Sequence, residues 1–161
     1  MLAFPTSRLL LFAVAAAVTA LLGYALYTQY YEGLEPCPLC MSQRLFYLLT
    51  GVTALIGGLH NRRTRAYGAA IALFAAAGAA IAARQVWLQH LPPDQVPACG
   101  PSLEYMLQTL PFSDALLHML RGDGNCAVVD WRFLGLSMAG WSLICFAGFA
   151  AIGLWQLLRR R

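Results

Sequence analysis

The sequence predicts an all-α membrane protein, built as a four-helix transmembrane bundle with two loops on one side of the membrane. The first observation is composition: the 161 residues are 60% hydrophobic and only 11% charged, whereas soluble domains carry about 25% charged residues. The second is that the apolar residues gather into four long stretches, and the third is that the charged residues lie between them. A chain of this length has room for about four spans and short loops, so residues 1–161 are expected to form one membrane domain.

The expected spans cover residues 9–29, 42–60, 66–89 and 138–158. A span needs about 20 residues, and the apolar part of the second stretch is short. We therefore expect the second span to include Met41 to Arg44, which places the residues before it at the membrane surface. A cleavable signal peptide is the alternative for the first stretch. Its apolar run is too long for one, however, and the tyrosines that follow it are typical of an interfacial belt.

Arginine predicts the orientation, because the chain has no lysine. Seven of its 11 basic residues flank the N-terminus, the turn between the second and third spans, and the C-terminus: Arg8, Arg62, Arg63, Arg65, Arg159, Arg160 and Arg161. With four spans these three places share one side, which the positive-inside rule assigns to the cytoplasm. Loops 30–41 and 90–137, which hold the acidic residues, are then expected outside. The net charge of +4 is thus a topology signal and does not indicate nucleic-acid binding.

The third span carries small residues at every fourth position, namely Gly68, Ala72, Ala76 and Ala80. Such stripes let membrane helices approach closely. Since the second span offers Gly51 and Gly58, we expect these two spans to pack together and to bring Arg44 and Arg84 toward a common place. The alternative is that both arginines simply extend to the outer membrane surface.

The long outer loop is too apolar for an ordinary solvated loop. Five prolines prevent it from forming one long helix: Pro92, Pro93, Pro97, Pro101 and Pro111. Its leucine-rich parts, around residues 103–110 and 116–120, predict short helices that lie along the membrane interface. A Gly-rich turn, residues 121–125, leads into Cys126.

Four cysteines in two pairs fall on the predicted outer side. Cys37 and Cys40 form a CxxC just before the second span, and Cys99 and Cys126 belong to the long loop. In a bacterium this side is the periplasm, where disulfides persist. Because thiol–disulfide exchange proceeds through mixed disulfides, two pairs in one chain can act as an electron relay. The fifth cysteine, Cys145, lies within the last span and is expected to be a small hydrophobe.

The CxxC favours a thiolate close to the membrane. A helix N-terminus stabilises negative charge, Cys40 is nearest that end, and Arg44 adds positive charge one turn further on. Such a thiolate can meet an electron acceptor dissolved in lipid. A quinone suits this position, since it is flat, has an apolar tail and has ring oxygens that need donors. No haem, flavin or nucleotide motif is present, so the quinone is inferred partly by elimination.

Three alternatives compete with the relay. A four-cysteine zinc site is disfavoured because Cys99 and Cys126 lack the close spacing of zinc-ligand pairs. A scaffold with purely structural bridges explains the cysteines but not Arg44. An enzyme like vitamin K epoxide reductase also joins a membrane CxxC to a quinone, but its active CxxC comes late in the helix bundle, whereas Cys37 and Cys40 follow the first span.

Two motifs carry a resemblance to a known family, and a third is weaker. The first is Cys37-Pro38-Leu39-Cys40 with Gln43-Arg44; the second is Cys126-Ala127 followed by Trp131, Phe133-Leu134-Gly135-Leu136, Met138 and Trp141; the third is Arg84 with Trp87-Leu88-Gln89 ahead of Cys99. In these residues, and in layout over its whole length, the chain resembles the disulfide bond formation protein B (DsbB) family. One departure is Met138-Ala139-Gly140-Trp141, where many members have Pro after Met. This departure concerns the start of the last helix and not the chemistry.

The resemblance implies an inner-membrane enzyme that re-oxidises a DsbA-like, thioredoxin-fold oxidase of the periplasm and passes the electrons to ubiquinone or menaquinone. It implies that Cys99 forms the mixed disulfide with that partner and that Cys37 bridges transiently to Cys126. Cys40 would face the quinone as a thiolate, and Arg44 would line the quinone site.

Two further residues are weaker candidates for contact with the quinone. Arg84 continues the small-residue row of the third span toward its outer end. His90 lies near the place where some members of the family have a histidine beside the quinone. No metal site is expected in the chain, and its partners are the oxidase, the quinone and the lipid bilayer.

Overall fold

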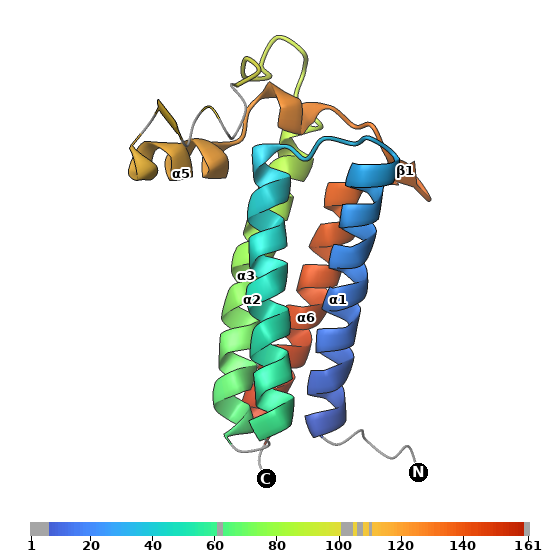
Figure 1. Ribbon diagram of the computed structural model, residues 1–161, viewed down its shortest axis with the longest axis vertical. Coiled ribbons are helices and arrows are strands. Elements are labelled where there is room, and N and C mark those ends of the chain that lie inside the picture. Colours follow the sequence, from blue (N-terminus) through green and yellow to red (C-terminus); the bar gives the residue numbers. More distant parts are fainter. Residues whose placement is uncertain (1–6, 61–62, 101–104, 106–107, 110, 160–161) are drawn as a thin grey trace.

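Four long helices form an elongated bundle in the computed structural model, which describes residues 7–60, 63–100, 105, 108–109 and 111–159 (Figure 1). They are α1 (Ser7–Tyr31), α2 (Pro38–His60), α3 (Thr64–Leu88) and α6 (Met138–Leu158). Each is long and apolar enough to cross a membrane. This confirms the predicted four-helix membrane bundle. The start of α1 and the end of α6 lie at the same end of the bundle.

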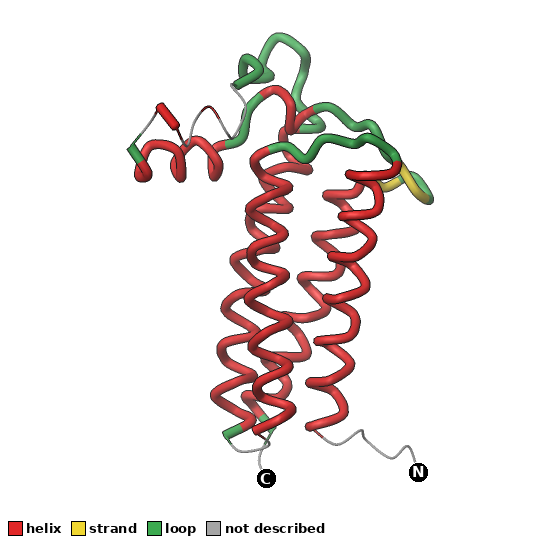
Figure 2. Tube along the Cα trace, in the orientation of Figure 1, coloured by secondary structure: helices red, strands yellow, loops and turns green. Residues whose placement is uncertain are grey.

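The segments between α3 and α6 gather at the other end (Figure 2). They include α5 (Phe112–Arg121), the 3-10 turn η1 (Gly124–Ala127), and a small antiparallel pair, β1 (Arg132–Phe133) and β2 (Leu136–Ser137). α5 lies across the direction of the bundle and exposes Leu116, Leu117 and Leu120. The expected apolar residues Leu103, Met106, Leu107 and Leu110 lie outside the described residues.

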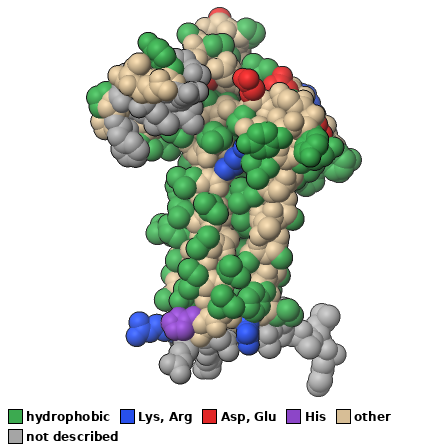
Figure 3. Space-filling view, in the orientation of Figure 1, with side chains coloured by type: hydrophobic (Ala, Val, Ile, Leu, Met, Phe, Trp, Pro, Cys, Tyr) green, Lys and Arg blue, Asp and Glu red, His purple; other side chains and the backbone are tan. Residues whose placement is uncertain are grey.

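The side chains on the surface differ between the shaft of the bundle and its two ends. Figure 3 shows hydrophobic side chains along the shaft of the bundle, acidic residues at the end that carries the loops, and histidine with basic residues at the opposite end. This is the distribution expected of a helix bundle with a lipid-facing shaft and two polar ends.

The second helix begins earlier than the span predicted for it. α2 starts at Pro38, and the backbone N–H of Met41 donates to the Cys37 carbonyl at 3.1 Å. Proline suits the first helical position because it has no N–H to leave unpaired and its φ is already helical. Cys37 therefore caps the helix and Cys40 lies in its first turn. The start of α6 is capped instead by Ser137, whose hydroxyl accepts from the N–H of Gly140 at 3.2 Å.

The helices pack as two hairpins, α1 with α2 and α3 with α6, and α2 also packs against α3. Aromatic side chains join the two hairpins in the core. The rings of Tyr47 on α2 and Phe146 on α6 stack with centroids 4.0 Å apart, and Phe146 is fully buried. This contact lies below the loops and closes the bundle beneath the cysteines.

The expectation that small residues pair the second and third spans is wrong. The closest approach of α3 is to α6: a Cβ on Gly68 would lie 2.8 Å from the Gly153 carbonyl oxygen. Gly51 and Gly58, the two glycines expected to meet the third span, face α1 instead, Gly51 against Val18 and Gly58 against Phe12. Of the α2 glycines, Gly57 faces α3, where it packs against the Tyr67 ring.

The regular spacing of the stripe explains the error. Four residues turn a helix by about 400°, so each step along such a row drifts about 40° round the axis. By Ala76 and Ala80 the row has left the contact and these residues are exposed. The buried face of α3 continues instead through Ala75, Gly78 and Ala82.

Candidate active site

Cys37 and Cys40 lie together at the outer end of α2. Their sulfur atoms are 3.0 Å apart, and the backbone N–H of Cys40 points at the Cys37 sulfur at 3.4 Å. A covalent S–S bond measures about 2.05 Å. All five cysteines of the chain are thiols in this structure. The arrangement is therefore that of a reduced pair held at the distance from which a bridge can form.

Cys126 reaches the same point from η1 and is completely buried. Its sulfur accepts a hydrogen bond from the Cys37 thiol and another from the backbone N–H of Leu39, at the start of α2. The hydrogen bond from Cys37, followed by the two backbone donors Leu39 and Asp123, lowers the pKa of Cys126. Hydrogen bonding to Cys126 and then to Cys40, together with burial, raises the pKa of Cys37. The same contacts therefore favour the thiolate form at Cys126 over that at Cys37.

Cys99 is exposed and lies beside the turn that holds Cys126. The N–H of Gly124 donates to the Ala98 carbonyl at 3.2 Å. A Cβ on Gly124 would lie 2.6 Å from the Pro97 carbonyl oxygen and 3.2 Å from the Cys99 sulfur, so only glycine permits this approach. The second cysteine pair therefore has one accessible member and one buried member.

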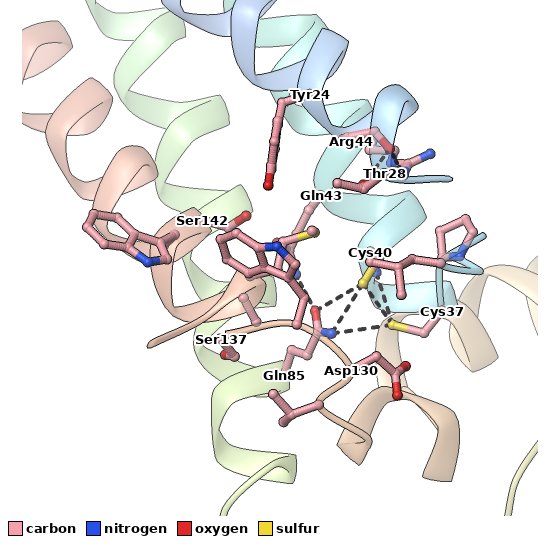
Figure 4. A pocket seen from close by; sticks show the side chains of 18 of the residues that line it. Tyr24, Thr28, Cys37, Cys40, Gln43, Arg44, Gln85, Asp130, Ser137 and Ser142 are labelled. Atoms are coloured by element: carbon pink, nitrogen blue, oxygen red, sulfur yellow. Dashed lines mark hydrogen bonds between the residues drawn. The ribbon is translucent and has the colours of Figure 1, made fainter. Parts of the chain in front are cut away.

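Gln85 of α3 contacts both cysteines of the CxxC. Its side-chain nitrogen donates to the Cys40 sulfur at 3.2 Å and to the Cys37 sulfur at 3.4 Å. Its side-chain oxygen accepts from the amide nitrogen of Gln43 at 2.7 Å. Figure 4 shows the Gln85 amide directed at the two sulfurs. Hydrogen-bond donors of this kind stabilise a sulfur anion.

Arg44 is fixed by α1. One terminal guanidinium nitrogen donates to the Gln29 side-chain oxygen, and the other donates to the Ala25 carbonyl at 2.9 Å. Two bonds from one planar group hold its orientation as well as its position. The guanidinium is half-buried and lies on the same side of α2 as the cavity described next.

A cavity of about 310 Å³ opens beside these residues. α1, α2 and α6 contribute to its wall, with Gln85 of α3, Gln89 just after that helix, and the segment that follows η1. Apolar side chains make up most of the lining, among them Leu21, Leu22, Trp131, Phe133 and Trp141. The polar part includes Cys37, Cys40, Gln43, Arg44 and Gln85, and also the carboxylates Glu35 and Asp130. An apolar pocket with a few converging polar groups is typical of a binding site for a small molecule.

Comparison with known proteins decides the family. The model of the family described as "Disulfide bond formation protein DsbB" matches residues 7–156. The chain belongs to the DsbB family. It is therefore a disulfide oxidoreductase, and its four apolar helices make it a multi-pass membrane protein.

Relatives in this family match most or all of the chain. It is 50% identical over 165 residues to Disulfide bond formation protein B of Azoarcus sp. (strain BH72), covering 100% of this chain and 99% of the relative. The protein of the same name from Hahella chejuensis is 49% identical over 161 residues, with 98% of each chain covered. That of Methylococcus capsulatus is 52% identical over 143 residues, with 85% of each covered.

Two residues expected near the DsbB site do not line its cavity. The Arg84 guanidinium lies over the Trp87 ring, 4.4 Å from its centroid, and donates to the Arg121 carbonyl at 3.4 Å. His90 is exposed, and its Nδ1 lies 2.8 Å from the Val86 carbonyl oxygen. Arg44 and Arg84 therefore point to different elements, because α3 presents its small-residue face to α6 and not to α2.

Sequence reasoning missed Gln85. A polar residue inside an apolar helix is expensive unless it is paired, and this cost is a signal of function. The charged residue next to it, Arg84, was predicted as a candidate for quinone contact instead. Gln43 was noted only as part of the CxxC motif. The helical spacing of the buried positions would have indicated Gln85, since it follows Gly78 and Ala82 on the buried face of α3.

The zinc alternative finds no support in the part of the chain that the structure describes. Within those residues, no group of three or more His, Cys, Asp and Glu side chains is placed to hold a metal ion. The thiols of Cys37, Cys40 and Cys126 are instead hydrogen-bonded to one another and to Gln85.

Proposed function

We propose that this protein re-oxidises a DsbA-like, thioredoxin-fold disulfide oxidase of the periplasm and passes the electrons to a membrane quinone. The observation that carries the proposal is the position of the Cys37 sulfur. It lies between the buried Cys126 and Cys40, and Cys40 lines an apolar cavity that also holds Arg44. Three sulfurs in this order provide a route from the exposed loop to the membrane.

The route begins at Cys99. A thiolate of the partner attacks Cys99 in an oxidised Cys99–Cys126 pair, forms a mixed disulfide and releases Cys126 as a thiolate. The second partner thiol then frees Cys99 and leaves the partner oxidised. The exposure of Cys99 supports its role as the point of attack, since its pair partner Cys126 is buried. The electrons now reside in the Cys99–Cys126 dithiol.

Cys126 carries the electrons onward. Its thiolate attacks Cys37 in the oxidised CxxC, so that the Cys37–Cys126 bond forms, the Cys37–Cys40 bond breaks and Cys40 leaves as a thiolate. The lowered pKa of Cys126 supports this role, because the attacking species is the thiolate. Cys40 is then released beside the cavity, which it lines.

The cavity suits a quinone head group. Its volume of about 310 Å³ lies at the lower end of the range for ligand pockets. Leucine and aromatic side chains match an apolar ring, and Arg44 offers a donor for ring oxygens. A quinone bound there supplies a sink for two electrons and two protons. Arg44 would orient it against Cys40, and ubiquinone and menaquinone both meet this description.

The protein is proposed to lie in the bacterial inner membrane with both termini in the cytoplasm. The arginines that flank the N-terminus, the turn between α2 and α3, and the C-terminus support this orientation. It places both cysteine loops, residues 30–41 and 90–137, in the periplasm, where the oxidase and its substrates are found. The function there is to sustain disulfide bond formation in periplasmic proteins.

Quinone reduction tests the proposal. The oxidised protein in detergent is mixed with a reduced thioredoxin-fold oxidase and a short-chain ubiquinone, and quinone loss is followed by absorbance. We expect turnover in the wild type and none in Cys40→Ser or Cys99→Ser, which remove the two ends of the relay. A wild type that does not turn over, with its cysteines locked in bridges, would contradict the proposal and favour the scaffold.

A further inference from the structure

The Gln85 side chain is engaged at both ends of its amide. It is 4% exposed, and so is Gln43, which donates to its oxygen at 2.7 Å. Buried polar groups need partners, and an amide in an apolar helix bundle is costly if it is left free. The partners of the Gln85 nitrogen are the two sulfurs of the CxxC. Its position is therefore explained by the redox pair and not by packing alone.

Gln43 determines which end of the Gln85 amide meets the sulfurs. An amide side chain presents an acceptor oxygen at one end and two donor hydrogens at the other. Since the Gln43 nitrogen takes the oxygen of Gln85, the two hydrogens of Gln85 are directed at Cys40 and Cys37. The Cys40 thiol also reaches the Gln85 oxygen at 3.6 Å. Gln85 can thus pair with Cys40 as a thiol or as a thiolate.

We propose that Gln85 is a catalytic residue that stabilises the Cys40 sulfur when Cys126 attacks Cys37, and that Gln43 is the positioning residue that orients it. This inference rests on the proposed relay. In the step concerned, the Cys126 thiolate and the Cys37–Cys40 disulfide become a Cys126–Cys37 disulfide and a Cys40 thiolate. One S–S bond forms, one breaks, and the negative charge moves from Cys126 to Cys40.

The leaving sulfur needs donors at the moment it takes the charge, because exchange is faster when the departing thiolate is stabilised. Cys40 departs at the edge of an apolar cavity, where water contributes little. Its side-chain partners in the structure are Cys37, which the step converts to a disulfide, and Gln85. Arg44 is held by Gln29 and Ala25 of α1. A neutral amide also avoids placing another charge in the membrane.

Turnover of a matched pair of variants is the first test. Gln85→Leu removes the donors and keeps the volume of the side chain. Gln156→Leu is the control, because Gln156 is equally buried, donates to the Ser7 carbonyl at 3.3 Å and lies at the far end of α6. A hydrogen bond to a charged group accounts for about a ten- to hundredfold change in rate. We expect a loss of that size in Gln85→Leu and near wild-type turnover in the control.

A double-variant cycle separates orientation from structure. Gln43→Leu frees the Gln85 amide to rotate, so it should lower turnover less than Gln85→Leu does. In a Gln85→Leu background the same change should have no further effect, because Gln43 acts through Gln85. Additive losses would overturn the positioning role. Gln43→Leu leaves Gln85 in place, so this variant also tests the proposal if Gln85→Leu does not fold.

The balance between two disulfide isomers gives a readout that needs neither quinone nor partner. In a Cys99→Ser background, Cys37, Cys40 and Cys126 share one disulfide, which is either Cys37–Cys40 or Cys37–Cys126. Acid quenching, alkylation and peptide mapping give their ratio. Without the donors of Gln85 the Cys40 thiolate is less stable, so Gln85→Leu should lower the share of Cys37–Cys126 about tenfold or more.

The relay and the role of Gln85 can be contradicted separately. If the wild type turns over and Gln85→Leu changes neither turnover nor the isomer ratio, the role of Gln85 is wrong and the relay stands. A wild type without turnover contradicts the relay, and the inference that rests on it falls too. A ratio that shifts equally in Gln156→Leu would show a general effect of losing a buried amide and would overturn the role of Gln85.

Discussion

Cys37 and Cys126 pack in one buried cluster at the N-terminus of α2, and hydrogen bonding with Cys37 lowers the pKa of the Cys126 sulfur. The N–H of Leu39 points at the same sulfur. The helix start was expected to favour a thiolate within the CxxC itself. In the structure this donor group also serves Cys126, the cysteine that must attack the CxxC. The helix terminus thus prepares the attacking sulfur.

The titration of Cys126 should depend on the Cys37 donor. The background is a protein in which Cys40, Cys99 and Cys145 are all changed to Ser. A hydrogen bond to the thiolate favours the charged form, so the pKa of Cys126 lies below its ordinary value while Cys37 is present. Cys37→Ala removes the donor and should raise this pKa. Cys37→Ser keeps a hydroxyl donor, so the pKa of Cys126 in this variant should lie between the values with Cys37 and with Ala.

The thiolate absorbance in the ultraviolet, followed against pH, measures this effect. The thiolate fraction of Cys126 at neutral pH should be highest with Cys at position 37, lower with Ser and lowest with Ala. Identical curves for the three proteins would show that Cys37 does not donate to Cys126, and the proposed direction of attack would lose its electrostatic basis.

Much of this arrangement could be predicted from residue type and position. Hydropathy located the four helices, because a lipid-facing helix must be apolar over its whole length. The CxxC and Arg44 were recognised because Arg44 follows Cys40 by one helical turn. These features depend on local sequence, which is why residue type and spacing could indicate them.

Contacts between distant helices could not be predicted in the same way. The partner of Gly68 depends on how α3 is rotated, and small residues occur on several faces of that helix. A rotation that turns Gly68 to Gly153 also turns Gln85 toward Cys37 and Cys40. The error about helix packing and the omission of Gln85 therefore have one cause, an unknown rotation of α3.

The seam between α3 and α6 should be intolerant of side chains. A Cβ on Gly153 would lie 2.7 Å from both the Ala72 nitrogen and the Gly68 carbonyl oxygen, which are backbone atoms and cannot rotate away. Gly153→Ala should therefore destabilise the protein by about 1–3 kcal/mol, the usual cost of overpacking. Thermal unfolding in detergent, followed by circular dichroism, measures the change.

Gly148→Ala is the matched control for this seam. Gly148 lies in the same helix, and a Cβ there meets nothing within 4 Å. Since alanine favours helix by roughly 1 kcal/mol over glycine, this variant should be as stable as the wild type or more stable. Equal behaviour of the two variants would mean that α3 and α6 are not in close backbone contact.

Arg84 and His90 should have little effect on quinone affinity. Neither lines the cavity: Arg84 is bound to the Trp87 ring and the Arg121 carbonyl, and His90 is exposed next to the Val86 carbonyl. In Arg84→Met and His90→Ala we expect the KM for a short-chain quinone to stay within about twofold of wild type, as for most surface changes. A tenfold rise in either variant would place that residue at the quinone.

Arg44 should have the opposite behaviour, because it lines the cavity and its two terminal nitrogens are fixed by Gln29 and Ala25. Arg44→Met removes the charge and should raise the KM for quinone by about tenfold or more, the size expected for a lost charged hydrogen bond. Lysine keeps the charge but lacks the planar fork, so Arg44→Lys should give an intermediate KM. Gln29→Leu tests the anchoring separately, since it frees one arm of the guanidinium and should raise the KM less than Arg44→Met does. Steady-state rates at several quinone concentrations distinguish these cases, and an unchanged KM in Arg44→Met would remove Arg44 from the quinone site.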